Sequence, residues 1–463
     1  MQHHENNDEV DLYRIVLLSS CGERVLVISD KGRLLLPSIS VPQYQRPAEH
    51  LTASLESKWT QRAVCLFALE GSQSAELRYY VMQSCEESPR CTASSLWVSL
   101  SSIAENQFHE AMDYAAVMDS VCQCQAHAGG QGAFGRLNWF SEITAWVGKV
   151  AAPQGLTLSG HFAQFNAGSA FSLVRFETCG PALWFKAVGE PNLREFSITL
   201  ALSSYFPTFL PPILAFRQDW NAWLAVEVEG QHPGETSPFE VWTTVAVTLA
   251  DLQIASMGRA LHLADLGCHN TRPFALAELV QPFLEAMAAL MAQQMKPLPW
   301  PLSRDELNSL AGQLQEILSD AAGLEIPDSI GHLDFNPGNI VVSASRCVFL
   351  DWAEASIGHP FITFEYLLEH FRRCQGINDS AVSALTKTYT DKWRPFLSPC
   401  QIERAMMLAP VLAVLSYAVC NNAWRQSPCL HPETARHLRS LTRRLKREAD
   451  QWATFAASRH VVS

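Results

Sequence analysis

The sequence has little charge for its length, and the charge it has is biased towards acid. Charged residues make up 17% of the 463 residues, and 34 Lys and Arg face 46 Asp and Glu, which gives a formal net charge of −12. An acidic chain repels phosphate backbones, so we expect no nucleic-acid partner. The apolar fraction of 48% is that of an ordinary globular protein and excludes a disordered chain. The length predicts two or three domains.

No Cys-x-x-Cys pair occurs among the 13 cysteines, and most of them lie in apolar runs. Free thiols of this kind are typical of a reducing compartment. A membrane-spanning run is also missing: the longest apolar run, residues 406–420, contains Pro410 and Ser416 and falls short of about 20 residues. The first residues are polar and acidic, unlike a targeting peptide. We therefore expect a cytoplasmic protein with no membrane partner.

Short strand patterns give way to helical patterns along the chain. Six strands and a helix at 47–59 are expected in residues 12–100, and a second helix at about 103–122. Four glycines in residues 127–135 predict a linker. Three antiparallel strands are then expected in 155–188, a helix near 193–203, a strand at 223–228 and a hairpin at 339–352. The other expected helices are about 238–264, 274–297, 303–322, 361–374, 378–393, 400–424 and 432–458.

A small β-rich part followed by a large helical part is the order of elements in a bilobal protein-kinase-like domain. We therefore expect an α+β fold with a small α/β domain before the kinase-like domain. The expected divisions are an N-terminal domain (1–126), a linker and helix (127–153), a β-rich lobe (154–237) and a helical lobe (238–463).

The most informative stretch is residues 331–358, which joins polar residues to two short apolar runs. Asp334 follows His332 by two residues, Asn339 follows Asp334 by five, and Asp351 ends an apolar run. Phosphoryl transfer to a hydroxyl needs a carboxylate that orients the hydroxyl and takes its proton, and ligands that hold Mg²⁺ against the phosphates. Asp334 suits the first task. Asn339 and Asp351 suit the second, because Mg²⁺ prefers oxygen ligands.

The two apolar runs predict a β-hairpin that brings these metal ligands together. Residues 340–342 and 348–350 are β-prone, and a three-residue turn centred on Ser345 would pair residue 341 with residue 349. In that register Asn339 lies opposite Asp351, with about 5 Å between their Cβ atoms. The alternative interpretation is that the Asp, Asn, Pro and Gly of this stretch are ordinary turn residues.

The stretch resembles the catalytic loop and metal-binding segment of the aminoglycoside phosphotransferase-like family, small-molecule kinases that share the protein-kinase fold. The family pattern is found here as His332-Leu333-Asp334, Asn339 and Asp351-Trp352. The resemblance implies that Asp334 is the catalytic base and that Asn339 and Asp351 bind Mg²⁺. The sequence departs from the family in two places, because Leu333 replaces the usual glycine and His359 stands where many members have aspartate.

Lys186 lies in the apolar run 182–188 and points away from its apolar neighbours. A lysine in an apolar strand needs an anionic partner. In a kinase-like lobe this lysine binds the nucleotide phosphates and an acidic residue of the next helix. We expect Glu195 to be that residue. Glu190 is the competitor, but it precedes Pro191 and is expected in a loop. The alternative is a lysine on a solvated edge strand.

The expected phosphate-covering loop, residues 164–171, has a single glycine. Asn166, Gly168 and Ser169 would allow backbone N–H groups to approach a phosphate. A plain hairpin turn would have the same residues.

Other charged residues could either bind a ligand or simply face solvent. The run 224–230 resembles the hinge that binds adenine through its backbone, near Glu227 and Glu229. Some acidic residues are candidates for binding a cationic substrate, although a solvated role explains them equally well. These are Glu354, Glu365 and Glu369. The basic residues of 436–447 are expected to form a solvated helix face.

The first 126 residues resemble a Nudix-like α/β fold in their order of strands and helices. The catalytic Nudix helix needs a cluster of glutamates, and the helix at 47–59 offers only Glu49 and Glu56. If the fold is right, the hydrolase chemistry is absent. An unrelated α/β module is an equal alternative.

We therefore expect a Mg²⁺-dependent kinase that uses ATP or GTP to phosphorylate a hydroxyl of a small molecule such as an aminoglycoside, an amino alcohol or a sugar. One rival is a nucleotide-binding pseudokinase whose N-terminal domain binds a partner. The poor glycine loop favours this rival, and the intact Asp334, Asn339 and Asp351 argue against it. A second rival, a protein kinase, is disfavoured because only about ten residues separate Asp351 from the next expected helix.

Overall fold

The computed structural model describes residues 10–43, 45–69, 77–86, 92, 95–126, 132–376, 378–427 and 429–460. Its contacts divide the chain into two compact units. Unit 1 consists of Met1–Phe196 and Pro212–Glu227, and unit 2 consists of Ser197–Pro211 and Val228–Ser463. Part of the expected glycine-rich linker, residues 127–131, lies outside the described residues.

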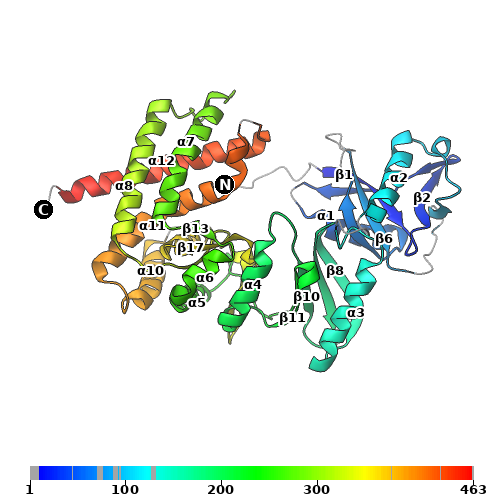
Figure 1. The fold of residues 1–463 in the computed structure, drawn as a ribbon, viewed down its shortest axis with the longest axis horizontal. Helices are drawn as coiled ribbons and strands as arrows, with labels where there is room; N and C mark the ends of the chain where they lie inside the picture. The colour runs from blue at the N-terminus through cyan, green and yellow to red at the C-terminus, as the bar shows by residue number, and fades with distance from the viewer. Residues whose placement is uncertain are drawn as a thin grey trace. The chain divides into compact units, whose positions relative to one another are not determined.

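Unit 1 begins with a mixed sheet of seven strands and two helices (Figure 1). The strands are β1 (Val10–Leu18), β2 (Arg24–Asp30), β3 (Arg33–Leu35), β4 (Ser38–Pro42), β5 (Ala63–Ala68), β6 (Leu77–Ser84) and β7 (Ser95–Ser99), and the helices are α1 (Pro47–Trp59) and α2 (Ala111–Ala126). The strand order is β3-β2-β1-β6-β5, with β4 beside β1 and β7 beside β2. Only β1 and β6 run parallel among the described pairs.

The six strands and the helix at 47–59 that the sequence predicts are confirmed. Ala48, Leu51, Leu55 and Trp59 of α1 are buried and recur at three- and four-residue spacing, so one face of this helix faces the core. Strand β4 was not predicted. The second helix begins at Ala111 rather than near residue 103, because residues 105–107 form a separate 3₁₀ turn.

A second, antiparallel sheet of five strands follows in unit 1, after helix α3 (Trp139–Ala151). It consists of β8 (Leu158–Gly168), β9 (Phe171–Thr178), β10 (Leu183–Ala187), β11 (Ile213–Arg217) and β12 (Ala222–Val226), in the order β11-β12-β10-β9-β8. The three predicted antiparallel strands in 155–188 are therefore confirmed. Every fourth residue of α3 from Trp139 to Ala151 is buried, and this face belongs to the same apolar cluster as Val174 and Phe185 of the sheet.

A buried glutamine joins the two sheets at their edges. The backbone N–H of Cys65 in β5 donates to Gln164 Oε1 (2.7 Å), and Gln164 Nε2 in β8 donates to the Cys65 carbonyl (3.2 Å). Both strands have a register shift at this point. The side-chain amide thus satisfies the backbone groups of an edge strand that would otherwise be buried without partners.

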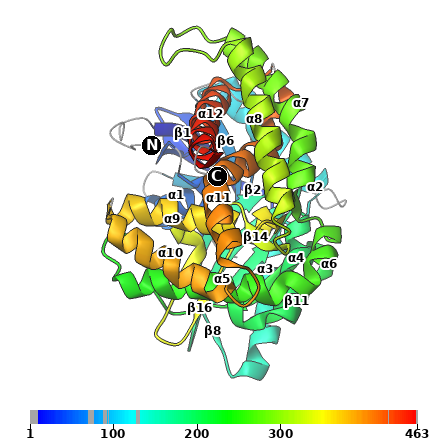
Figure 2. The same cartoon turned by 90° about the vertical axis from the view of Figure 1, so that its left-hand side faces the viewer.

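Unit 2 is mainly helical. Helix α4 (Arg194–Tyr205) begins in unit 1 and lies mostly in unit 2. The other helices are α5 (Phe239–Ser256), α6 (Ala260–Asp265), α7 (Pro273–Ala292), α8 (Arg304–Gly323), α9 (Phe361–Gln375), α10 (Asp379–Trp393), α11 (Pro399–Cys420) and α12 (Pro432–His460). Helices α7 and α8 lie side by side (Figure 2). The helix predicted at 238–264 is interrupted by a 3₁₀ turn, which separates α5 from α6.

Two small sheets complete unit 2. The first has the order β13-β17-β14 and consists of β13 (His269–Thr271), β14 (Ser329–His332) and β17 (Ala355–Gly358). The second is the hairpin of β15 (Ile340–Val342) and β16 (Cys347–Phe349). The hairpin was predicted, and the three-stranded sheet was not, because its strands are three or four residues long and carry little periodicity.

Within the described residues, α7 and α11 are long and apolar enough to cross a membrane by length and composition. Both contribute side chains to the apolar core of unit 2. In the most apolar window of α11, 67% of the residues are buried, and Pro410 lies inside this helix. The burial of α11 is that of a core helix of a globular unit.

The expected solvated face of α12 is only partly confirmed. The Arg443 guanidinium donates to the Trp300 carbonyl (3.0 Å) and to the Gln294 side chain, and Arg444 forms an ion pair with Glu369 of α9. Long basic side chains on this helix reach neighbouring elements of the same unit, so these two charges serve packing.

Candidate active site

The loop after β14 presents Asp334 to solvent. Leu333 and Phe335 on either side of it are buried in the apolar core, so the loop is anchored by its apolar residues and only the carboxylate faces outwards. The side chain of Leu333, which replaces the usual glycine of the family pattern, is therefore accommodated in the apolar core.

Two amide side chains orient the Asp334 carboxylate. Asn336 Nδ2 donates to Asp334 Oδ1 (2.9 Å), and Asn339 Nδ2 donates to Asp334 Oδ2 (3.2 Å) and to the Asp334 carbonyl (2.9 Å). The Asn336 side chain is itself held, because its Oδ1 accepts from the Gly338 N–H (2.8 Å). Both carboxylate oxygens are thus held by neutral donors, and Asn336 is a site residue that the sequence prediction missed.

His332 links this loop to the segment that ends in Asp351. The Asp334 N–H donates to His332 Nδ1 (3.2 Å), so the ring proton is on Nε2, which donates to the Leu350 carbonyl (3.0 Å). The ring is buried against Trp352 and Phe335. Burial lowers the pKa of His332, which favours the neutral form that both hydrogen bonds require.

The predicted register of the hairpin is wrong by one residue. Val341 pairs with Val348 rather than with residue 349, and the Leu350 N–H donates to the Asn339 carbonyl (2.8 Å), so Asn339 lies opposite Leu350 and not opposite Asp351. The turn has two residues instead of three. Its cause is Ser343, whose Oγ accepts from the Arg346 N–H (3.2 Å) and whose own N–H donates to the Arg346 carbonyl (2.8 Å).

Asp351 lies one residue beyond the paired strands and has a left-handed backbone, with φ of 59°. Strand alternation therefore does not set the direction of its side chain. Aspartate tolerates this conformation better than most residues, and such backbone outliers concentrate at functional sites. The residue is exposed, whereas Trp352 after it is buried.

The Asn339 amide is compatible with a metal. Its Nδ2 is occupied by Asp334, and among the described residues no group donates to its Oδ1. One amide oxygen and one carboxylate are the kind of hard oxygen donors that Mg²⁺ takes beside nucleotide phosphates. Within the described part of the chain no group of three or more His, Cys, Asp and Glu side chains is placed to hold a metal ion. Asn339 and Asp351 as magnesium ligands stay a prediction.

In unit 1 the predicted pair of Lys186 and Glu195 is confirmed. Lys186 Nζ of β10 lies 2.5 Å from Glu195 Oε1, in the first turn of α4. The Glu195 side chain is 2% exposed, and a carboxylate at such a position needs charged or hydrogen-bonding neighbours, of which this lysine is one. The ammonium also lies 5.6 Å from the centre of the Trp223 ring. Glu190, the competitor, is exposed in the loop before Pro191.

The expected phosphate-covering loop is a tight hairpin between β8 and β9. Gly168 pairs with Phe171, and the Asn166 side chain accepts from the N–H of Ala167. The Ser169 carbonyl accepts from the Phe134 N–H (2.9 Å), which fastens the tip of the loop. A Cβ on Gly168 would come within 2.4 Å of the Phe171 ring, so this glycine serves packing within the hairpin. Phosphate binding by Asn166, Gly168 and Ser169 stays a prediction.

The two hinge residues differ in their surroundings. The Glu227 carboxylate accepts from Arg175 Nε (2.7 Å) and Nη2 (2.9 Å) and from Trp184 Nε1 (3.1 Å), and the Arg175 guanidinium holds the pKa of Glu227 below its usual range. The Glu227 N–H donates to the Ala182 carbonyl, so only its own carbonyl is left for a ligand. Glu229 is exposed.

The three acidic residues that could bind a cationic acceptor also differ in their surroundings. Glu365 is buried against Arg372 (2.9 Å) and Glu369 pairs with Arg444, so both serve packing. Glu354 is 40% exposed and bonds His269 Nε2 (2.9 Å). Burial raises the pKa of Tyr417, and the nearby charges of Asp334 and Glu354 raise it further.

The charge of Asp334 reaches residues of two helices. Tyr417 of α11 and His370 of α9 are both close enough to feel its charge. The sequence prediction missed both residues. Ser416 and Tyr417 do interrupt the apolar run of α11, but such an interruption does not tell which residue of another element it faces.

Residues 211–396 match the family model described as the phosphotransferase enzyme family. No curated protein matches the chain. Solved structures that match the chain include a macrolide 2′-phosphotransferase from Brachybacterium faecium, with 16% identity, a TM-score of 0.41, and coverage of 64% of this chain and 97% of that chain. The choline kinase LicA from Streptococcus pneumoniae has 12% identity, a TM-score of 0.43, and coverage of 68% and 99%. An aminoglycoside phosphotransferase from Alicyclobacillus acidocaldarius has 14% identity, a TM-score of 0.40, and coverage of 62% and 90%.

The family model spans the end of the five-stranded sheet, the Asp334 loop, the hairpin and Asp351. The match therefore rests on this segment, and residues 211–396 are similar to the phosphotransferase enzyme family.

Proposed function

We propose that this protein is a Mg²⁺-dependent phosphotransferase that moves the γ-phosphate of ATP or GTP to a hydroxyl group of a small molecule. The family match supports phosphoryl transfer. The observation that carries the proposal is the Asp334 carboxylate, which is exposed on an anchored loop and oriented by Asn336 and Asn339. A carboxylate held in this way by neutral donors is suited to align an acceptor hydroxyl and take its proton.

Asn339 and Asp351 would hold Mg²⁺, which when bound neutralises charge on the transferring phosphates. The protein's own contribution is to keep both ligands in place. His332 ties the Leu350 carbonyl, next to Asp351, to the N–H of Asp334, so the proton acceptor and the metal ligand share one buried support.

Lys186 would bind phosphate oxygens of the nucleotide. Its pairing with the buried Glu195 keeps the ammonium from adopting other rotamers, which lowers the entropic cost of binding a phosphate. In this role Lys186 holds the nucleotide and takes no part in proton transfer.

The surroundings of Asp334 support an acceptor that carries a positive charge besides its hydroxyl. Glu354 is partly exposed, and its charge acts on Tyr417, which is 37% exposed. An aromatic ring near a carboxylate is suited to bind a cation. Aminoglycosides, amino alcohols and amino sugars each carry both a hydroxyl and a positively charged amine. Sugar-like acceptors are therefore included in the proposal. The acidic chain as a whole favours such a substrate.

A small acceptor is favoured over a protein. The short strand β17 begins four residues after Asp351 and α9 begins at Phe361, so no long segment is present there for docking a peptide. We expect this enzyme to act in the cytoplasm, where nucleoside triphosphates are available.

A nucleotide-binding pseudokinase with a partner-binding N-terminal region is the second candidate. The specific observation in its favour is the β8–β9 hairpin, whose tip is fastened to Phe134 and has one glycine. Such a hairpin offers less backbone freedom for closing over a phosphate.

Consumption of ATP and GTP by the purified protein, measured with Mg²⁺ and a panel of amino alcohols, aminoglycosides and sugars, tests the proposal. We expect at least one acceptor to raise consumption in the parent protein, and Asp334→Asn to abolish the increase. Nucleotide binding without turnover for any acceptor in the panel would favour the pseudokinase.

A further inference from the structure

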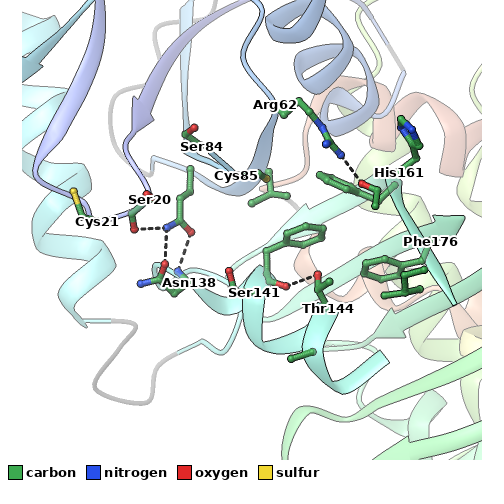
Figure 3. A pocket seen from close by; sticks show the side chains of 17 residues that line it. Ser20, Cys21, Arg62, Ser84, Cys85, Asn138, Ser141, Thr144, His161 and Phe176 are labelled. Carbon is green, nitrogen blue, oxygen red and sulfur yellow. Dashed lines mark hydrogen bonds between the residues drawn. The ribbon is translucent and has the colours of Figure 1, made fainter. Parts of the chain in front are cut away.

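A large cavity lies in unit 1, and none of the residues assigned to phosphoryl transfer lines it. Its volume is about 740 Å³, within the range of small-molecule sites. It is lined by the first sheet, by the start of α3 and by strands β8 and β9 (Figure 3). The two sheets thus build the cavity together, at the junction that Gln164 bridges.

The lining has one strong cation and no carboxylate. Among its residues are Arg62 and His161 but neither Asp nor Glu, although the chain has a formal net charge of −12. The Arg62 Nη2 donates to the Gly160 carbonyl (2.6 Å), and within the described residues Arg62 forms no ion pair. A guanidinium with one backbone bond keeps other N–H groups for an anion.

The cavity also has an aromatic wall. The rings of Phe140 and Phe162 lie 4.3 Å apart, and the Phe140 and Phe176 rings are stacked at 5.8 Å. The Arg62 guanidinium lies over the Phe162 ring at 5.5 Å, so the cation adjoins this wall. Arg62 and His161 lie at one end of the cavity, and Asn138 and Ser20 lie at the other (Figure 3).

The polar end opposite Arg62 is fixed. Gln83 Nε2 donates to the Ser20 carbonyl (2.9 Å) and to Asn138 Oδ1 (3.2 Å), and the Asn138 N–H donates to Gln83 Oε1 (2.8 Å). These groups satisfy one another, so they shape this end without demanding a charged partner.

We propose that this cavity binds a small aromatic carboxylate. The ring of the ligand packs on Phe140, Phe162 and Phe176, and its carboxylate accepts from Arg62. A cation has no acidic group to meet, and a polyphosphate needs more positive charge than one arginine supplies. The site is independent of the phosphotransferase residues, and no residue of the proposed catalytic set lines it.

Isothermal titration calorimetry and ligand-observed NMR on the full-length protein test the proposal. The probes are benzoate, indole-3-acetate and naphthoate, with benzylamine as the cationic analogue and acetate as the analogue without a ring. We expect saturable binding of at least one aromatic carboxylate and none of benzylamine or acetate. Binding of benzylamine as tight as that of the carboxylates, or no saturable binding of any aromatic carboxylate, overturns the proposal.

Two variants locate the site, and one serves as a control. Arg62→Ala should weaken carboxylate binding by about 10–100-fold, the loss expected for one charge-assisted pair. Ala145→Trp places a large ring in the cavity from an exposed position of α3 and should block binding without altering the core. Arg33→Ala removes an exposed arginine of the same sheet outside the cavity and should bind like the parent. Equal thermal unfolding midpoints confirm intact folding, and unchanged binding in both cavity variants overturns the assignment.

Discussion

The Lys186–Glu195 pair and the Asp334 loop differ in the groups that surround their carboxylates. In unit 1, the Glu195 carboxylate is buried and pairs with Lys186 at 2.5 Å. In unit 2, the Asp334 carboxylate is exposed, and the groups that hold it are the uncharged amides of Asn336 and Asn339. Removing one partner of a buried pair leaves an uncompensated charge, whereas an exposed carboxylate held by neutral donors stays accessible to ligands.

This difference assigns nucleotide binding to the lysine and proton transfer to the exposed carboxylate. A lysine fixed by a buried glutamate is built to stay in one place and bind an anion. A carboxylate on an anchored loop, free of cationic partners among the described residues, is built to meet a hydroxyl. The two sites should therefore fail in different ways when they are mutated.

The largest expected effect is on turnover, at Asp334. Asp334→Asn keeps the shape of the side chain and removes the proton acceptor, so turnover of the acceptor should fall by about 10²–10⁴-fold. A coupled assay of nucleotide consumption measures it. Asp305→Asn, at an exposed position of α8, is the matched control and should leave the rate unchanged. Parent-like turnover of Asp334→Asn would refute the kinase proposal.

A charged metal ligand should affect binding and rate together. Asp351→Asn removes one of the two proposed magnesium ligands, so the affinity for Mg²⁺–nucleotide should weaken and turnover should drop by about 10²–10³-fold. A titration of activity against Mg²⁺ should also shift to higher concentrations. An unchanged Mg²⁺ requirement would mean that Asp351 is not a ligand.

Lys186 should matter for binding more than for the chemical step. Lys186→Ala removes one charge-assisted bond to a phosphate, and the affinity for nucleotide should fall by about 10–100-fold. Glu195→Gln, which keeps the lysine but loosens it, should have a smaller effect, and Lys149→Ala, at an exposed position of α3, should have none. Equal nucleotide affinity in the parent and in Lys186→Ala would instead make the pair a purely structural one.

His332 should give the smallest effect, and it should depend on pH. His332→Phe keeps a buried ring but leaves the Asp334 N–H and the Leu350 carbonyl without partners, so turnover should fall by about 10-fold and the free energy of unfolding by about 1–3 kcal/mol.

The pKa of His332 is lowered in the folded protein, so the unfolded chain binds its proton more readily. The stabilisation is complete above the ordinary histidine pKa of about 6.5 and is lost as the pH falls from there towards the lowered value. Urea unfolding of the parent and of His332→Phe at pH 5 and pH 7.5 measures this difference. A parent protein that loses no more stability in acid than the variant would contradict the neutral, hydrogen-bonded ring.

The sequence predicts both charged sites, for different reasons. Lys186 interrupts an apolar strand, and a charge in that position needs a partner within reach, which led to Glu195. The Asp334 loop was found through its spacing to Asn339 and Asp351 and through the family pattern. In both cases the prediction rests on residues close together in the chain.

What the sequence did not predict depends on side-chain conformation and on distant segments. The hairpin register is wrong by one residue because the Ser343 hydroxyl closes a two-residue turn. The bridge from Gln164 to Cys65 joins residues 99 positions apart, and an alternating strand pattern gives no sign of it. The charge of Asp334 acts on Tyr417 of α11 and His370 of α9, and the sequence pattern of these helices gives no sign of it.

The most direct test that Asp334 acts in the chemical step and not in nucleotide binding is the affinity of Asp334→Asn for Mg²⁺–nucleotide. It is measured by calorimetry beside the parent and Asp351→Asn. We predict that Asp334→Asn binds with an affinity within about threefold of the parent although it no longer turns over, and that Asp351→Asn binds clearly more weakly. Loss of Mg²⁺–nucleotide binding in Asp334→Asn, with binding retained in Asp351→Asn, would contradict the assignment of both residues.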